Sequence, residues 1–456
     1  MGVSYSAPST STCVSTPTPS LPARPAVSSL AALASPRSWL VSLARNSILS
    51  VLRHSIKAGH LQIEDIDGSV YNFGRRQKHK DDILLKVVND DSSDLGFSEA
   101  YIYGDVLISD LKAVMELYLD NSDMISSLPS ALARLGSTFS ALSNAFLGQS
   151  KTRALANVVV SYDQSNELFK AFLSQEMMYS CALWGPEEDG VNGDLGQDEE
   201  KCEERYFDIE QAQFRKIHHV LRKAKVGRGS TVLEVGSGWG AMAIAARDYG
   251  CIVHSLTLSI EQKKLADERI REAGVQDRVT VHLMDYRDVL TKPDWAKAFD
   301  AFVSIEMVEH VGAKYYNTYF KMIDYALKGK DATAVISCST FPESRYTDYQ
   351  AEDFMRRYMW PNSCLPSATT LVNAAQTGTQ GRLMLDGVEN HSSHYPRTLR
   401  TWSHRFRENV DMDLLPFESR QSYEAFERKW RYFFAYAEVG FLKGWITCHM
   451  VCFKRS

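Results

Sequence analysis

The sequence lacks three features that would each point to a particular class of protein, and its first segment lacks acidic residues. It contains no uninterrupted apolar run of about 18 residues, which argues against a membrane-spanning helix. Its 8 cysteines form no CxxC pair and no Cys/His metal spacing, so they indicate reduced intracellular thiols rather than a disulfide framework or a metal site. The formal net charge of −5 provides no general basic field, which argues against a nucleic-acid partner. Finally, the first 63 residues contain neither Asp nor Glu.

This acid-free segment is dominated by Ser, Thr, Pro and Ala up to Arg37. Such a composition cannot bury enough apolar surface to become ordered, so residues 1–37 are predicted to be a disordered leader. The arginines of the segment also fit a mitochondrial transit peptide, although its prolines oppose the amphipathic helix that such a peptide needs. The start MGVSYS matches a myristoylation pattern at Gly2, but so short a pattern often matches by chance. We therefore expect an unmodified leader, with mitochondrial targeting as the alternative.

Residues 38–150 are predicted to form a small accessory α/β domain. The stretch 39–57 places apolar side chains on one side and basic residues among the polar positions, as in a helix that packs on a core or lies on a bilayer. The alternating segments HLQIEDIDGSVYNFG and ILLKVV predict a small sheet with Asp67-Gly68 as a turn. The segment SDLKAVMELYLDN predicts a helix that Ser109 opens. A Ser/Ala-rich stretch then closes the domain at residue 150.

Residues 151–456 are predicted to form an α/β catalytic domain. From Thr231 onward, helical stretches separate the apolar runs TVLEVGSGWG, CIVHSLTLS, VTVHLMD, FDAFVSIEM and ATAVISCST. Buried parallel strands joined by crossover helices have this pattern. Before them, the acidic, Gly-rich segment 186–204 is predicted to be a solvated surface insertion, with a mobile flap near the site as the alternative.

The segment VLEVGSGWG places Gly236, Gly238 and Gly240 between a predicted strand and a helix, where a ligand can approach the backbone. A dinucleotide site would need a carboxylate about 20 residues later for the ribose hydroxyls. The second strand ends in HSLTLSIEQ, without an acid at its tip, so a nicotinamide dehydrogenase is disfavoured. The E/D-x-G-x-G form instead resembles the first motif of class I methyltransferases that use S-adenosylmethionine.

Seven further motifs occur in one order: YDQSNELFKAFLSQEMMYSCALW, TLSIEQ, MDYRD, VSIEMVEHVGAKYYNTYF, RRYMWPNSCLPS, HYPRTLRTW and RKWRYFFAYAEVGF. Together they resemble the cyclopropane-fatty-acid synthase family, which includes the mycolic acid cyclopropane synthases. The region of GHLQIEDIDGSVYNFG and SEAYIYGD, which begins at Gly59, also resembles the small extra domain of the longer, bacterial-type members. The resemblance implies a class I S-adenosylmethionine-dependent methyltransferase (Rossmann-like) fold with a helical cap, preceded by the small N-terminal α/β domain.

The resemblance also implies a cofactor site and no metal. The residues carried over to S-adenosylmethionine are Tyr162, Ser180, Gly236, Gly238, Thr257, Leu258, Gln262, Asp285 and Tyr286. Gln262 would supply the ribose contact, because an amide can hydrogen-bond two hydroxyls without carrying a charge. Without the motif order, Asp285 and Tyr286 would simply form a strand-end turn, and Gln262 would be an exposed helix residue.

Methyl transfer to an alkene leaves a carbocation, which must be stabilised and then deprotonated before a ring can close. Aromatic faces stabilise a desolvated cation by about 2 kcal/mol. In the resembled family, the base is a bound bicarbonate held by a glutamate, a histidine, a tyrosine and backbone amides. The aromatic candidates, most of which we expect to be ordinary core, are Tyr179, Tyr316, Phe320, Trp360 and Tyr436.

The resemblance assigns the bicarbonate contacts to Glu309 of EHVG, to Tyr395 of HYPRTL and to the backbone amide of Cys181. The thiol of Cys181 need not react, and without the resemblance it would be a core thiol. At the position of the family histidine this chain has Ser337, or Cys338 if the alignment slips by one. That departure removes a charge-assisted contact worth roughly 1.5–3 kcal/mol. The neighbouring Glu306 is outside the motif match, and we expect His310 to be structural.

The sequence therefore predicts methyl transfer from S-adenosylmethionine to the double bond of an unsaturated fatty acyl chain of a phospholipid, or of another lipid-like alkene, with closure of a cyclopropane ring. The alternatives are a methyl-branched lipid, terpenoid or polyketide product, N-methylation of a small amine, and a lipid-binding protein with a relic cofactor site. We expect a cytoplasmic protein that contacts the membrane surface transiently. The sequence leaves the oligomeric state open, with a homodimer among the alternatives.

Overall fold

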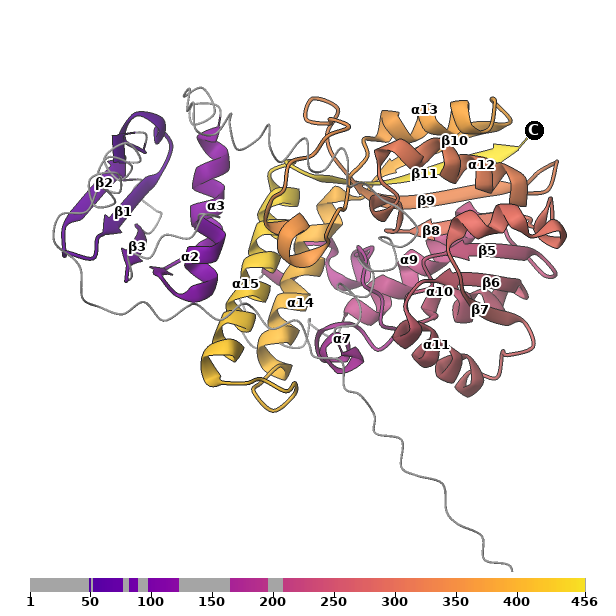
Figure 1. Ribbon diagram of the computed structural model, residues 1–456, viewed down its shortest axis with the longest axis horizontal. Coiled ribbons are helices and arrows are strands. Elements are labelled where there is room, and N and C mark those ends of the chain that lie inside the picture. Colours follow the sequence, from indigo (N-terminus) through magenta and orange to yellow (C-terminus); the bar gives the residue numbers. More distant parts are fainter. Residues whose placement is uncertain are drawn as a thin grey trace, which may run out of the picture.

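The computed structural model describes residues 49–50, 52–76, 82–88, 97–122, 165–195 and 208–455. Two sheets organise this part of the chain, with helices α14 and α15 standing between them (Figure 1). The predicted leader, most of the predicted helix at 39–57 and the cofactor candidate Tyr162 lie outside the described residues, and the domain limits stay predictions. Within the described ranges, no helix combines the length and the apolar character that crossing a bilayer requires.

The N-terminal sheet has four strands in the order β2-β1-β3-β4. Strand β1 (His60–Glu64) pairs antiparallel with β2 (Val70–Gly74) across the predicted turn, where Gly68 has φ 80°. It also pairs in parallel with β3 (Ile83–Val87), which in turn pairs with β4 (Val106–Ile108). The structure thus confirms the small sheet and its turn.

Helices α2 (Phe97–Tyr103) and α3 (Leu111–Asp120) accompany this sheet. The prediction that Ser109 opens α3 is wrong, because Asp110 is the N-cap and accepts a hydrogen bond of 3.0 Å from the Ala113 N–H. The Ser109 hydroxyl instead accepts from the Leu84 N–H of β3 at 3.0 Å. Both residues are good caps, and the pairing of Ser109 with the sheet decides which one begins the helix.

The second sheet has seven strands in the order β10-β11-β9-β8-β5-β6-β7. The five predicted strands are all present and run parallel: β5 (Thr231–Val235), β6 (Ile252–Thr257), β7 (Val279–Leu283), β8 (Ala301–Ile305) and β9 (Thr333–Thr340). The sequence did not predict the edge strand β10 (Leu383–Asn390) and its neighbour β11 (Thr447–Arg455), which pair antiparallel with each other. Strand β11 also runs antiparallel to β9.

Helices cover both faces of the seven-stranded sheet, which explains why its strands are continuously apolar. Val232 and Leu233 are consecutive on β5 and both are fully buried, but they belong to two different core clusters on opposite faces. Residues of α12 (Tyr316–Ala326) and α13 (Ala368–Gly378) share the cluster of Leu233. The cluster of Val232 contains residues of α9 (Ile209–Lys223), α10 (Ala241–Ala245) and α11 (Ile260–Glu272).

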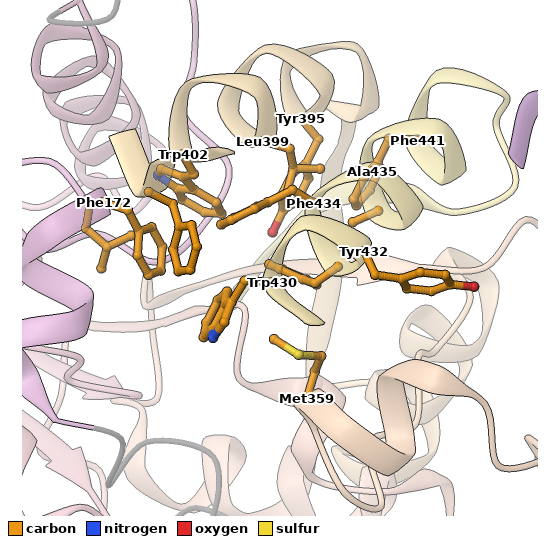
Figure 2. Packing of buried hydrophobic residues seen from close by; sticks show 14 of the residues in the cluster. Phe172, Met359, Tyr395, Leu399, Trp402, Trp430, Tyr432, Phe434, Ala435 and Phe441 are labelled. Carbon is orange, nitrogen blue, oxygen red and sulfur yellow. The ribbon is translucent and has the colours of Figure 1, made fainter. Parts of the chain in front are cut away.

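A third cluster, rich in aromatic side chains, joins α14 (Tyr395–Asn409) and α15 (Arg420–Leu442) to α7 (Asn166–Phe172) (Figure 2). The ring of Phe172 lies 5.3 Å from that of Trp430 and 5.8 Å from that of Phe434. Burying each such side chain contributes roughly 1.5–3 kcal/mol. This cluster forms the helical cap beside the seven-stranded sheet.

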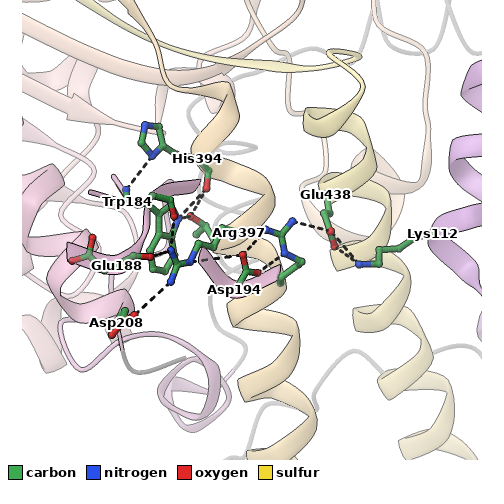
Figure 3. A network of polar contacts seen from close by, with 11 residues as sticks. Lys112, Trp184, Glu188, Asp194, Asp208, His394, Arg397 and Glu438 are labelled. Atoms are coloured by element: carbon green, nitrogen blue, oxygen red, sulfur yellow. Dashed lines mark hydrogen bonds and ion pairs between the residues drawn. The ribbon is translucent and has the colours of Figure 1, made fainter. Parts of the chain in front are cut away.

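A network of ion pairs connects the cap helices to α3 on one side and to the segment that contains Asp194 on the other (Figure 3). Lys112 of α3 donates to Glu438 of α15 at 3.1 Å, and Arg400 of α14 donates to the same carboxylate at 3.3 Å. Arg400 also pairs with Asp194 at 2.5 Å. The accessory sheet is therefore tied to the cap through α3.

The prediction of a solvated insertion at 186–204 holds for only part of its described residues, 186–195: Glu187 and Asp189 are exposed, whereas the other two acidic side chains are buried. Asp194 is buried against Arg400, and Glu188 is buried and pairs with Arg215 at 2.6 Å. The acidic composition of the segment therefore reflects both partners that lie far away in the sequence and exposure to water. Residues 196–204 lie outside the described ranges.

Candidate active site

A cavity of about 160 Å³ lies at the carboxyl ends of β5, β6, β7 and β8. The chain order changes direction between β5 and β8, and this is where open α/β sheets bind ligands. Eight of the nine predicted cofactor residues line this cavity, and the ninth, Tyr162, is not described. The eight are Ser180, Gly236, Gly238, Thr257, Leu258, Gln262, Asp285 and Tyr286.

The glycine turn after β5 is open toward this cavity. Gly236 has φ 101°, and a Cβ atom there would lie 3.1 Å from the Cβ of Met307, so glycine is needed for both conformation and space. Gly238 has φ 49°, and a Cβ there would meet no atom within 4 Å. The turn therefore leaves its backbone accessible to a ligand.

Polar side chains complete the cavity. The Thr257 hydroxyl donates to the Gln262 side-chain carbonyl at 2.9 Å, and Gln262 is buried rather than exposed. Asp285 pairs with Arg287 at 2.6 Å. The hydroxyl of Tyr286 is buried and has no hydrogen-bond partner among the described residues. The open glycine turn and this orphaned hydroxyl fit a polar nucleoside ligand such as S-adenosylmethionine.

Glu234 lies at the end of β5 and contributes a buried carboxyl group to the same cavity. Burial raises its pKa to about 8, although a hydrogen bond of 2.5 Å from the Ser255 hydroxyl opposes the shift. The group is therefore mostly neutral at pH 7.

A larger, mainly apolar cavity of about 610 Å³ adjoins the first. The two cavities share three lining residues: Tyr179, Glu306 and His310. From this junction the larger cavity extends past the cap helices to side chains of the four-stranded sheet, including Ile63 and Leu85. It is open to an elongated apolar ligand.

The aromatic candidates separate into two groups. Tyr179, Trp360 and Tyr436 line the larger cavity. Tyr316 and Phe320 belong instead to the core between the seven-stranded sheet and α12. Tyr179 is supported by the Trp402 ring, whose centroid is 5.3 Å away. The aromatic wall at the junction is therefore made by Tyr179.

Glu306, which follows β8, is the most constrained residue at the junction. Its carboxylate accepts a hydrogen bond of 2.8 Å from the Cys181 N–H and a second one from the Tyr395 hydroxyl. Its φ of 48° is a left-handed conformation that costs of order 1–3 kcal/mol for a residue other than glycine. The structure thus brings two predicted anion-binding donors together, and both of them contact Glu306. The thiol-bearing residue Cys181 is buried and lines neither cavity.

Glu309 lies one short turn further on and lines the larger cavity. Its Oε1 accepts from the Ser339 N–H at 2.6 Å, whereas its Oε2 is buried and has no partner among the described residues. Burial, reinforced by the charge of Glu306, raises the pKa of Glu309 to about 8. Glu309 is therefore a buried carboxyl group rather than a solvated one.

Ser337 lies on β9, is buried and lines neither cavity. Its backbone carbonyl accepts a hydrogen bond of 2.7 Å from the N–H of Glu306. The contact of Ser337 with the junction is therefore made by its backbone, which holds the turn after β8.

Two further groups lie near the junction. The sequence did not point to Lys216, and His310 was expected to be structural. Lys216 of α9 is buried and donates to the Ser180 hydroxyl at 2.5 Å; burial lowers its pKa to about 8, and Glu306 opposes that shift. Lys216 interrupts the buried stripe of an amphipathic helix, and this pattern could have revealed it. His310 lines both cavities, and burial lowers its pKa to about 4, so its ring is neutral at pH 7.

Comparison with known families and proteins shows the family and the fold of this chain. The family model for mycolic acid cyclopropane synthetase matches residues 149–451. Tuberculostearic acid methyltransferase UfaA1 from Mycobacterium tuberculosis is 32% identical over 357 residues, which cover 78% of this chain and 77% of that protein. Cyclopropane-fatty-acyl-phospholipid synthase from Escherichia coli K12 is 32% identical over 259 residues, 57% of this chain and 58% of that enzyme.

Among solved structures, coclaurine N-methyltransferase bound to N-methylheliamine and SAH superposes with a TM-score of 0.59. The match covers 78% of this chain and 98% of that one, with 18% identity, so it bears on the fold alone. It confirms the predicted class I S-adenosylmethionine-dependent methyltransferase fold.

Proposed function

Because the chain belongs to the mycolic acid cyclopropane synthetase family and is an S-adenosylmethionine-dependent methyltransferase, we propose that it methylates the double bond of an unsaturated fatty acyl chain of a phospholipid. One observation carries this proposal: an apolar cavity of about 610 Å³ meets the smaller cavity at Tyr179, Glu306 and His310. A lipid chain is the ligand class that fills such a space by burying apolar surface.

In this proposal, the residues of the smaller cavity hold S-adenosylmethionine, which supplies an electrophilic methyl group. The glycine turn would accommodate the cofactor backbone, and Gln262 and Asp285 would contact its ribose and adenine portions. At the junction, the face of Tyr179 would stabilise a developing carbocation by about 2 kcal/mol. The apolar walls would keep water from quenching that cation.

We propose the cyclopropane as the product, formed when the transferred methyl group loses a proton and closes onto the neighbouring carbon. One relative is named for cyclopropane formation on phospholipids, and another is named a methyltransferase of tuberculostearic acid. A methyl-branched or methylene product is therefore the alternative outcome at the same site. N-methylation of a small amine is less favoured, because an amine needs neither a long apolar cavity nor a base for ring closure.

The test is to incubate the purified protein with S-adenosylmethionine carrying a ¹³C-methyl group and with vesicles of dioleoyl phosphatidylglycerol. The lipid is then analysed by NMR for ring, methyl-branch and methylene carbons. We expect ring carbons. Label in an added amine but none in the lipid would contradict the proposal, and failure of calorimetry to detect S-adenosylmethionine binding would favour a relic cofactor site.

We also propose a peripheral contact with the membrane, because a phospholipid acyl chain has to leave a bilayer to reach the cavity. Deleting residues 1–48 removes the leader and the first half of the predicted basic amphipathic helix, with Arg45, but keeps Leu52 and Ile56 in the cavity wall. We expect weaker binding to anionic vesicles in a flotation assay. Equal binding of the two proteins would contradict a docking role for this segment.

A further inference from the structure

The anion-binding donors at the junction are already occupied by a side chain of the protein itself. The Cys181 N–H and the Tyr395 hydroxyl both donate to the carboxylate of Glu306. A free bicarbonate at the same donors would have to displace this carboxylate. It would also add a negative charge beside the carboxylate of Glu306, and like charges in one site oppose each other.

From this geometry we propose that the Glu306 carboxylate takes the place of an external anion and is the base that accepts the proton during ring closure. The proposal rests on the proposed function, since it concerns the same reaction. Glu306 is suitably located because it lines both cavities, at the point where a methyl group passes from one ligand to the other.

The backbone at Glu306 supports a functional role for this side chain. Its φ of 48° belongs to a region that favours glycine, and the turn is fixed by a hydrogen bond of 2.7 Å from its N–H to the Ser337 carbonyl. A glycine would fit this turn without strain. Of the described residues other than glycine that have a positive φ, Glu306 alone lines both cavities, so the strained turn holds its side chain at the junction.

The surroundings of Glu306 suit a base that alternates between carboxylate and carboxylic acid. Tyr395, the Cys181 amide and the buried ammonium group of Lys216 favour the carboxylate, whereas burial favours the acid. The other titratable groups nearby are the neutral ring of His310, the carboxyl of Glu309 and the thiols of Cys338 and Cys448. Burial raises the pKa of Cys338, a hydrogen bond with Cys181 together with burial raises the pKa of Cys448, and Glu306 adds to both shifts. The surroundings of Glu306 therefore do not fix it as carboxylate or as carboxylic acid. A group that accepts and releases a proton in each turnover requires this.

The step balances without an oxidant or a reductant. The π electrons of the alkene form a bond to the methyl carbon as its bond to sulfur breaks, with both electrons of that bond remaining on sulfur. The other alkene carbon becomes cationic. Glu306 then accepts a proton from the new methyl group, and the electrons of that C–H bond form the third side of the ring. The carboxylic acid of Glu306 returns its proton to solvent before the next turnover.

Three variants test the proposal with the full chain. Glu306→Gln keeps the shape of the side chain but removes the base, and Glu306→Gly relieves the backbone and opens the space in front of the two donors. Asp331→Gly is the matched control, because Asp331 has φ 57° and lies exposed after α12, away from both cavities. Each protein is assayed for labelled lipid in bicarbonate-depleted buffer and after bicarbonate is added.

We expect the wild type and Asp331→Gly to form product equally with and without bicarbonate. Glu306→Gln should lose about 100-fold in rate, with no recovery. Glu306→Gly should lose as much in depleted buffer and regain roughly tenfold when bicarbonate is added, since the anion can then serve as the base. A wild-type rate that falls severalfold on depletion, or a fully active Glu306→Gln, would overturn the proposal.

A binding measurement provides a readout that does not depend on activity. ¹³C-bicarbonate should bind to Glu306→Gly and raise its midpoint of thermal unfolding, but should do neither with the wild type or Asp331→Gly. Saturable binding to the wild type with displacement of Glu306 would overturn the proposal. If the wild type transferred no label to lipid, the proposed function would fail, yet this measurement would still decide whether Glu306 replaces the anion, because it uses neither substrate.

Discussion

The Tyr395 hydroxyl donates a hydrogen bond to the Glu306 carboxylate, although the two residues are 89 positions apart in the sequence. Tyr395 is the first residue of α14 and Glu306 follows β8, so this bond joins the cap to the sheet. The ring of Tyr395 stacks on Phe441 of α15 with centroids 4.0 Å apart and planes 10° apart (Figure 2). The position of the hydroxyl at the junction therefore depends on the packing of the cap.

Tyr395→Phe should lower the rate of methyl transfer to lipid by about 10- to 100-fold. A hydrogen bond to a charged group is worth roughly 1.5–3 kcal/mol, and the phenyl ring leaves one carboxylate oxygen without its donor. The stacked ring remains, so the variant should stay folded, with a midpoint of thermal unfolding lowered only by the loss of this one hydrogen bond. The control is Tyr432→Phe, which removes another hydroxyl from the wall of the larger cavity. Equal rates for the two variants would contradict the role of the Tyr395 hydroxyl.

Local patterns in the sequence predicted most of the fold. The β1–β2 hairpin follows from alternation around Asp67-Gly68, and the five parallel strands follow from short apolar runs between helices. The C-terminal strands β10 and β11 were missed, and their pairing with each other and with β9 is made between segments far apart in the chain.

The positions of the candidate site residues were predictable where they belong to a short continuous motif. The cofactor candidates at strand ends converge on one cavity because parallel strands end at the same edge. The position of Glu306 was not predictable, since its contact with the Cys181 amide spans 125 positions and depends on a positive φ that no sequence pattern reveals. The EHVG motif contains Glu309 and not Glu306, so the sequence favoured Glu309.

Cys181→Ser should keep a substantial part of the activity. The contact that Cys181 makes with Glu306 comes from its backbone N–H, which serine retains, and the residue lines neither cavity. The measurement is the initial rate of label transfer to lipid, with circular dichroism to verify the fold. Nearly complete inactivation of a folded variant would show that the sulfur atom of Cys181 takes part in the reaction.

Glu309→Gln should lose most of the activity, in contrast to Cys181→Ser. The Oε2 atom of Glu309 is buried without a partner among the described residues, at the wall of the larger cavity, where a carboxyl group can exchange a proton and an amide cannot. The contact with the Ser339 N–H is preserved by the amide oxygen, so the fold should survive. A rate within twofold of the wild type would show that Glu309 has a structural role.

Ile63→Trp should shift the preference of the enzyme toward shorter acyl chains. Ile63 lies on β1 and lines the part of the larger cavity that reaches the four-stranded sheet, which is separated from the seven-stranded sheet by the cap helices (Figure 1). A larger side chain there shortens the cavity without touching the junction. Rates on phospholipids of graded chain length test this, with Leu107→Trp at an exposed position of the same sheet as the control. An unchanged length profile would contradict the assignment of this cavity to the acyl chain.

Glu234 should make the stability of the protein fall as the pH rises. Its carboxyl group is protonated in the folded protein up to a pKa of about 8, whereas its ordinary value is 4.5. Between these values unfolding releases a proton, so the free energy of unfolding decreases with pH by up to about 1.4 kcal/mol per pH unit. This contribution is fully present below pH 4.5 and is lost as the pH passes 8.

In Glu234→Gln this contribution is absent, while the shifted groups Glu309, His310 and Lys216 titrate in both proteins and cancel in the comparison. Urea unfolding at pH 5, 6, 7 and 8 should therefore give a difference, wild type minus variant, that falls steadily with pH, and a constant difference would contradict the raised pKa.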